Sequence, residues 1–299
     1  MLFQRRLHFH QFFGKTRVTG SLSRQWYSKL PSKLADIKKL RSETNASMDL
    51  VKQSVEEAGV GNLELAREIL KKKIVQRGGK LAEKSKNRTA KEGWIIQCIS
   101  EDGRKAVMAE INCESDFVAQ TTPFQDLARR IASTFLHYLP TNHSSYSVEA
   151  TLKNEILKHQ AYVSKNHEAN EKDVSSNVSL EEEIVKMTSF TGEKVQVQRL
   201  HCMNARVPST AIGIFSHGAK QSSPLQQLGR IGSMVQINSD LSTRKGLSNQ
   251  IAKEIVAQDP SSTSELLSFR SLVDSEKTIK DVLGQSTILE WVRWERGGN

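Results

Sequence analysis

Between residues 34 and 74, hydrophobic positions recur every three or four residues, which is the spacing of amphipathic helices. The three faces are Leu34, Ile37 and Leu40; Met48, Val51 and Val55; and Leu63, Ala66, Ile69, Leu70 and Ile74. Thr44 to Ser47 can cap the second helix and Gly59 and Gly61 can end it. The pattern predicts a three-helix domain over residues 32–79, closed by Arg77-Gly78-Gly79.

Residues 80–91 are polar and rich in lysine, and they predict a linker whose charges are solvated. The periodicity then changes. Trp94 to Ile99 and Lys105 to Cys113 are typical of strands, and Asp102-Gly103 between them is a strong hairpin signal. We therefore expect an antiparallel pair directly after the linker.

A helix follows this pair, and the plan then recurs. Its predicted apolar face is Phe124, Leu127, Ile131, Phe135 and Tyr138, with Pro140 as its end. Met234 to Asp240 echoes Met108 to Asp116, and a helical face of Leu247, Ile251 and Ile255 comes after it. The sequence thus predicts an α+β fold in which the helical domain precedes two similar antiparallel sheet/helix subdomains, over 92–190 and 191–296.

Further elements complete the second half. Leu180 to Met187 and Lys277 to Leu283 predict short helices, and Ile288 to Trp294 predicts a last strand. Asp259 to Phe269 carries no heptads, so we expect no coiled-coil dimerisation through this segment.

The composition fits a globular protein. Of 299 residues, 37% are hydrophobic and 25% are charged, and no apolar run approaches the roughly 20 residues that a membrane span needs. The three cysteines, Cys98, Cys113 and Cys202, lie far apart without a CxxC spacing. We expect them to be reduced, buried thiols and not disulfide partners or zinc ligands.

Positive charge is concentrated at the beginning of the chain. Residues 1–35 hold seven basic residues and no acid before Asp36, so only +3 of the net charge of +10 remains for the rest. Because aromatic residues alternate with these charges, residues 1–28 predict a mitochondrial transit peptide and a location in the matrix. The alternative is a basic arm that binds nucleic acid.

Catalytic motifs are missing. His167-Glu168 lacks the second histidine of HExxH, no GxSxG occurs, and the eight histidines are scattered. The sequence therefore predicts a binding protein with no catalytic, cofactor or metal site.

Asp116 and Phe117 lie on the predicted connection between a strand and a helix. Spacing alone favours Phe117 as a buried residue and Asp116 as a helix N-terminal signal. The other interpretation is an exposed contact pair, because contact residues gather on loops of rigid scaffolds. Met48, near the first inter-helix loop, is likewise either a contact or a core methionine.

Four stretches carry a family resemblance. They are Thr44 to Lys52, Asn62 to Ala66, Ile111 to Ala119 with Phe124, and Ser216 to Ala219. Together they resemble elongation factor Ts, the nucleotide exchange factor for elongation factor Tu, and with the leader they are similar to its mitochondrial form. The three-helix domain resembles ubiquitin-associated modules.

The resemblance implies a partner-binding site. It consists of Asp116, Phe117 and Val118, which reach the partner's G domain, with Met48, Lys52, Gly192 and His217 as further contacts. Phe117 would be a wedge near the partner's Mg²⁺ site, without touching the nucleotide. Three departures are Asp49 in place of a methionine, Thr191 in place of an isoleucine, and a longer loop over 220–228.

The implied partner is elongation factor Tu, GDP-bound and nucleotide-free, in a 1:1 complex without membrane or nucleic acid. A competing hypothesis is a mitochondrial RNA- or ribosome-associated binding protein, which predicts a basic mature chain and steep salt dependence. A third is a ubiquitin-binding adaptor built on the helical domain alone.

Overall fold

The computed structural model describes residues 32–44, 46–138, 145–147, 150–162, 178–205, 207–218, 223–239 and 244–298. The predicted transit peptide, Pro140 and Asp240 lie outside these ranges. The chain divides into two compact units, one up to Leu70 and one from Lys71 onward.

The first unit contains α2 (Lys33–Thr44), α3 (Met48–Ala58) and the beginning of α4 (Leu63–Lys84). The three predicted helices are confirmed, and their buried residues include Ile37, Leu40, Val51, Val55, Ala66 and Leu70. Leu34 was expected on the same face but is 62% exposed. Each three-residue step turns a helix by about 60° short of a full circle, so Leu34 lies about 120° from Leu40.

Helix α4 continues past its predicted end at Gly79 and runs to Lys84. The prediction of a helix end was therefore wrong, and the first residues of the predicted linker are helical. A Cβ atom on Gly78 would lie 2.3 Å from the carbonyl oxygen of Val185, whereas one on Gly79 would meet nothing within 4 Å. Gly78 thus permits a close helix contact, and neither glycine stops the helix.

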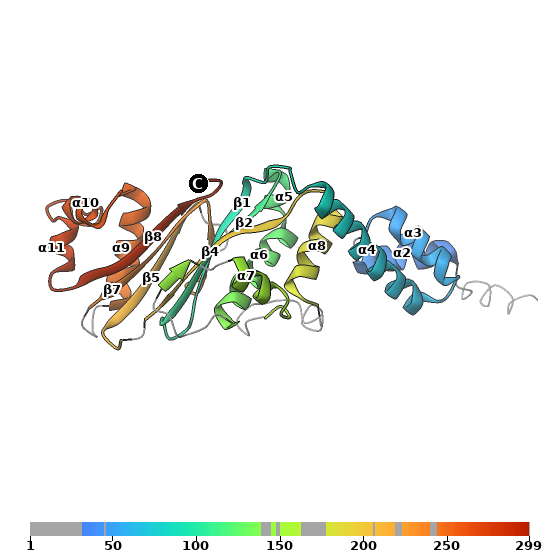
Figure 1. Cartoon of the computed structure of the whole chain (residues 1–299), viewed down its shortest axis with the longest axis horizontal. Coiled ribbons are helices and arrows are strands. Elements are labelled where there is room, and N and C mark those ends of the chain that lie inside the picture. The colour runs from blue at the N-terminus through green and yellow to red at the C-terminus, as the bar shows by residue number, and fades with distance from the viewer. Residues whose placement is uncertain are drawn as a thin grey trace, which may run out of the picture. The chain divides into compact units, whose positions relative to one another are not determined.

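The second unit is built on two antiparallel sheets (Figure 1). The five-stranded sheet has the order β3 (Ser145–Ser147), β4 (Gln196–Asn204), β2 (Lys105–Cys113), β1 (Glu92–Ile99) and β6 (Gln226–Gly229). The three-stranded sheet has the order β5 (Thr210–His217), β7 (Ile231–Asn238) and β8 (Thr287–Glu295). The predicted hairpin is confirmed, since β1 pairs with β2 in antiparallel register.

The sheets do not follow the predicted division of the core at residue 190/191. Strands β4 and β6 come after it in sequence but pair with β2 and β1 in the first sheet. The five-stranded sheet therefore contains strands from both sides of the predicted boundary, whereas all three strands of the other sheet come after it.

Helices cover the outer face of each sheet. On the five-stranded sheet these are α5 (Asp116–Gln120), α6 (Thr122–Tyr138), α7 (Ala150–Leu157) and α8 (Leu180–Thr191). On the three-stranded sheet they are α9 (Arg244–Gln258), α10 (Thr263–Ser268) and α11 (Ile279–Leu283). The inner faces pack together through residues that include Ile95, Met108, Ile212 and Met234. The result is a helix–sheet–sheet–helix arrangement.

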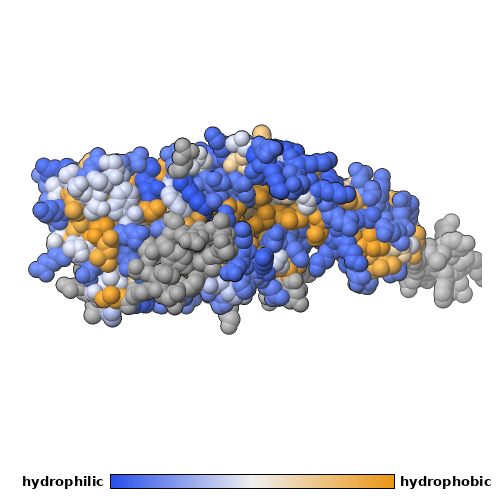
Figure 2. Space-filling view, viewed as in Figure 1, coloured by the Kyte–Doolittle hydropathy of each residue, from blue (hydrophilic) through white to orange (hydrophobic). Residues whose placement is uncertain are grey.

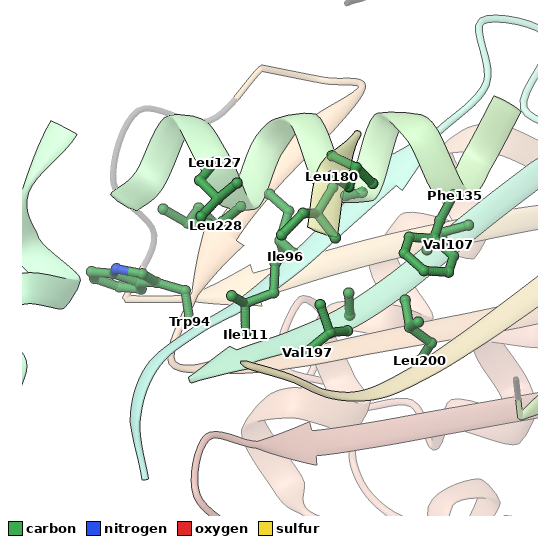
Figure 3. Close-up of a cluster of buried hydrophobic side chains, with 14 of the residues drawn as sticks. Trp94, Ile96, Val107, Ile111, Leu127, Phe135, Leu180, Val197, Leu200 and Leu228 are labelled. Atoms are coloured by element: carbon green, nitrogen blue, oxygen red, sulfur yellow. The ribbon is translucent and has the colours of Figure 1, made fainter. Parts of the chain in front are cut away.

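Strand β1 is buried on both faces, which explains its continuous apolar run. Trp94 and Ile96 face α6, as Figure 3 shows, while Ile95 and Ile99 face the second sheet. The predicted face of α6 is buried except for Tyr138, which is 39% exposed at the end of the helix.

The three cysteines are free and buried, as predicted. Burial raises the pKa of the Cys98 thiol to about 11 and that of Cys113 to about 12. For Cys113 the nearby carboxylate of Glu193 acts in the same direction. Both thiols therefore stay protonated at neutral pH.

Candidate partner-binding site

The segment after β2 begins a helix and is not an open loop. Ser115 is extended, with φ −120° and ψ 152°, and its Oγ accepts a hydrogen bond from the Val118 N–H at 3.3 Å. This is an N-cap, so Asp116 and Phe117 are the first two residues of α5. Asp116 lies in the first turn, where a negative charge is favourable.

The side chain of Phe117 is 83% exposed. The prediction from spacing that Phe117 is a core residue is therefore wrong. Ala119 is fully buried instead, and its carbonyl accepts a hydrogen bond from the indole Nε1 of Trp94 at 2.6 Å. Val118 packs partly against the same core. Since the next two residues turn inward, α5 directs Phe117 to the surface.

A carboxylate from a distant segment holds the residues just before α5. Glu193 accepts hydrogen bonds from the Ser115 hydroxyl at 2.5 Å, from the Ser115 N–H at 3.0 Å and from the Glu114 N–H at 3.2 Å. In return, Glu114 accepts from the Lys194 N–H at 2.6 Å. Each segment thus supplies a carboxylate to the backbone of the other.

Arg88 connects the same two segments. Its Nη1 lies 3.2 Å from Oε1 of Glu114 and 3.3 Å from the carbonyl oxygen of Gly192. The ammonium of Lys194 donates to the carbonyls of Lys86 and Arg88, at 2.9 and 3.1 Å. Residues 86–88, 114–115 and 192–194 therefore form one polar junction at the base of α5.

Gly192 belongs to this junction. It ends α8 in a left-handed conformation, φ 74° and ψ 4°, and its N–H donates to the Thr188 carbonyl at 2.9 Å. The structure therefore brings Gly192 together with the residues that precede Phe117. Glu114, Glu193 and Arg88 were not among the predicted site residues, and the only available signal was that Glu193 follows Gly192.

His217 ends β5 in the other sheet and is exposed. Its carbonyl accepts from the Arg230 N–H at 2.9 Å. The neighbouring Ser216 hydroxyl donates to Oε1 of the buried Gln97, at 2.7 Å, and Gln97 in turn donates to the Ser233 carbonyl at 2.5 Å. These bonds connect β1 with β5 and β7 and so fix the end of β5 relative to the first sheet. No described contact joins His217 to Phe117.

Met48 and Lys52 belong to the first unit. They are four residues apart on α3 and so lie on one face of this helix. Met48 is 36% exposed and Lys52 is exposed, as a contact surface requires.

Apolar side chains are spread over the surface. The face seen in Figure 2 is mostly hydrophilic, with apolar residues in separate small groups.

In the part of the chain that the structure describes, no helix is long and apolar enough to cross a membrane. Among the same residues, no group of histidine, cysteine or acidic side chains is arranged to hold a metal ion.

The described residues form a helical unit and a unit of two packed sheets, with an exposed aromatic ring on a capped short helix. Residues 114–290 match the family model described as Elongation factor TS. The mitochondrial elongation factor Ts of Schizosaccharomyces japonicus is 37% identical over 284 residues, covering 92% of this chain and 87% of that protein. The chain therefore belongs to the elongation factor Ts family, whose members are nucleotide exchange factors and not enzymes.

Bacterial relatives show the same resemblance. Elongation factor Ts of Prosthecochloris aestuarii is 33% identical over 247 residues, which is 82% of this chain and 72% of that protein. The Aquifex aeolicus protein of the same name is 46% identical over 103 residues, 34% of each chain. The expected resemblance to this family is confirmed.

Proposed function

We propose that this chain is the guanine nucleotide exchange factor of mitochondrial elongation factor Tu and promotes GDP release and GTP loading during translation elongation. The observation that carries the proposal is the exposed ring of Phe117 on the fixed start of α5, in a chain of the elongation factor Ts family. The ring inserts near the partner's Mg²⁺ site. The factor makes no contact with the nucleotide itself.

Exchange by such a factor follows from linkage between two binding equilibria. The factor accelerates GDP release only if it binds the nucleotide-free partner more tightly than the GDP-bound one. A ring that fits only when the Mg²⁺ and phosphate contacts are loosened supplies this difference. By reciprocity, binding of GTP lowers the affinity of the partner for the factor. Each thousandfold change in affinity corresponds to roughly 4 kcal/mol.

The remaining site residues support the same complex. Asp116 and Val118 flank the ring, Gly192 lies at the junction below it, and His217 adds a contact from the second sheet. Met48 and Lys52 provide a separate contact from the helical domain over residues 32–79, which resembles ubiquitin-associated modules. We propose a 1:1 complex, in which each chain uses its one copy of each contact.

A mitochondrial location is part of the proposal. It rests on the acid-free, Arg-bearing segment 1–28 and on the relative from Schizosaccharomyces japonicus, whose name includes "mitochondrial". The competing RNA- or ribosome-binding hypothesis has no observation of its own in the structure.

The test is GDP release from purified mitochondrial elongation factor Tu loaded with a fluorescent GDP analogue. Adding the mature chain should accelerate release in proportion to its concentration until the partner is saturated. A release rate equal to the spontaneous rate at every concentration would overturn the proposal.

A further inference from the structure

The start of α5 depends on a carboxylate that lies 78 residues further along the chain. We propose that Glu193 is a positioning residue for Phe117: it fixes the direction in which α5 presents the ring, and thereby the rate of nucleotide exchange. The inference rests on the proposed function and names a residue through which the same site acts.

The hydrogen bonds to Glu193 use both oxygens of its carboxylate as acceptors. Three donors converge on it, the N–H groups of Glu114 and Ser115 and the Ser115 hydroxyl. A carboxylate only accepts hydrogen bonds, and bonds to a charged acceptor are the stronger kind. The two N–H groups share Oε2 and the Ser115 hydroxyl donates to Oε1. A glutamine can keep its oxygen at the first position, but its NH₂ group cannot accept from the Ser115 hydroxyl, so the charge and one of the three bonds are lost.

The carboxylate of Glu193 is itself held in place. Gly192 and Lys194, the residues on either side of it, are fastened by Arg88 and by the Glu114 carboxylate. Because the backbone on both sides is fixed, Glu193 meets its donors without ordering a free loop. The site is therefore preorganised before any partner arrives.

Two different sets of contacts hold the two ends of α5. The rear is held by the buried Ala119 and by the bond from Trp94 to its carbonyl. The front depends on Ser115, whose hydroxyl both donates to Glu193 and caps the Val118 N–H. Removing the acceptor at Glu193 loosens the N-terminal end of α5 while the core stays packed. The rate of exchange should therefore be affected more than the free energy of unfolding.

The test compares Glu193→Gln with Glu181→Gln in the full mature chain. Glu181 is an exposed acid at the start of α8, so its substitution changes the net charge equally without touching the junction. The readouts are the maximal rate of GDP release at saturating factor, the factor concentration for half-maximal release, and the urea midpoint. Each substitution is also combined with Phe117→Ala, and Ser115→Ala is measured as a second disruption of the same contacts.

Glu193→Gln should lower the maximal release rate about tenfold, the effect of weakening bonds to a charged group. Glu181→Gln should change it less than about twofold, as a surface substitution does. In the Phe117→Ala background, Glu193→Gln should have almost no further effect, because the ring that it positions is gone. Ser115→Ala should also lower the maximal release rate. If Glu193→Gln lowers the urea midpoint strongly, the release rate of Ser115→Ala becomes the test of the inference.

If Glu193→Gln lowers the maximal release rate by the same factor in the wild-type and Phe117→Ala backgrounds, the inference is overturned. Glu193 would then act on stability or on another contact. Wild-type behaviour of both Glu193→Gln and Ser115→Ala would overturn it too. These results differ from failure of the proposed function, in which the wild-type chain itself does not accelerate GDP release.

Discussion

Truncating the Phe117 ring should separate binding from folding. A phenylalanine side chain has roughly 200 Å² of surface, and 83% of Phe117 is exposed. Only about 35 Å² is therefore buried on folding, worth at most about 1 kcal/mol at 25 cal/mol per Å². We expect Phe117→Ala to lower the free energy of unfolding by no more than this, and by about 0.5 kcal/mol if the unfolded chain also shields the ring.

The same arithmetic gives a large effect on exchange. If the partner covers the exposed part of the ring, about 165 Å² leaves water, worth about 4 kcal/mol. An interface hot spot loses roughly 2 to 4 kcal/mol on truncation, so kcat/KM for GDP release should fall about 30- to 1000-fold. Asp116→Ala should act in the same direction but less, because an exposed carboxylate mainly orients a complex.

The measurements are a urea midpoint and a GDP-release rate on the same preparation. Phe124→Ala is the matched control, because Phe124 is fully buried in α6 only seven residues away. It should lower the free energy of unfolding by about 3 to 5 kcal/mol. A large fall in the midpoint of Phe117→Ala, with normal exchange by the folded fraction, would refute the reasoning.

Other variants test separate parts of the structure. Removing residues 1–28 should leave exchange unchanged and abolish import into mitochondria, and import of the shortened chain would contradict the targeting prediction. Removing residues 1–70 should weaken binding to elongation factor Tu while the remainder still melts cooperatively, as calorimetry can check. Gly79→Ala should raise stability by up to about 1 kcal/mol, as expected for an exposed helix, whereas Gly78→Ala should lower it because its Cβ meets a carbonyl. The Cys113 thiol should react with Ellman's reagent at pH 8 only after denaturation.

Elements with strong local patterns were predictable from the sequence. The hairpin of β1 and β2 follows from two short apolar, strand-like runs around Asp102-Gly103, and Gly103 indeed adopts φ 68°. The buried face of α6 follows from its helical spacing. In both cases the signal lies within about 20 residues, so no knowledge of distant partners is needed.

Features that depend on distant contacts were not predictable. A Gly-Gly pair is typical of a helix end, but Gly78 lies inside α4 because α8 packs against it. The partner of β2 on its other side is β4, about 90 residues further along the chain, and no periodicity reveals such a pairing. The same holds for Glu193, whose neighbours in sequence give no sign of the donors that it meets.

Phe117 shows why residue type and spacing were insufficient at the site. An apolar residue next to a strand is usually buried, and the position of Phe117 on a predicted connection was a local signal against that expectation. Its exposure results from the capped start of α5, the buried Ala119 and the Glu193 carboxylate acting together. A contact role for this ring was one of two interpretations of the residues, and the family resemblance favoured it.

A fixed ring also suits the proposed exchange better than a flexible one. Ordering a mobile segment on binding costs free energy for each immobilised residue, and this cost would reduce the affinity for the nucleotide-free partner. Because α5 is already held at its front by Glu193 and at its rear by Trp94, that cost is met during folding. The interaction energy of the ring is then available for discriminating between the two states of the partner, and this difference alone accelerates GDP release.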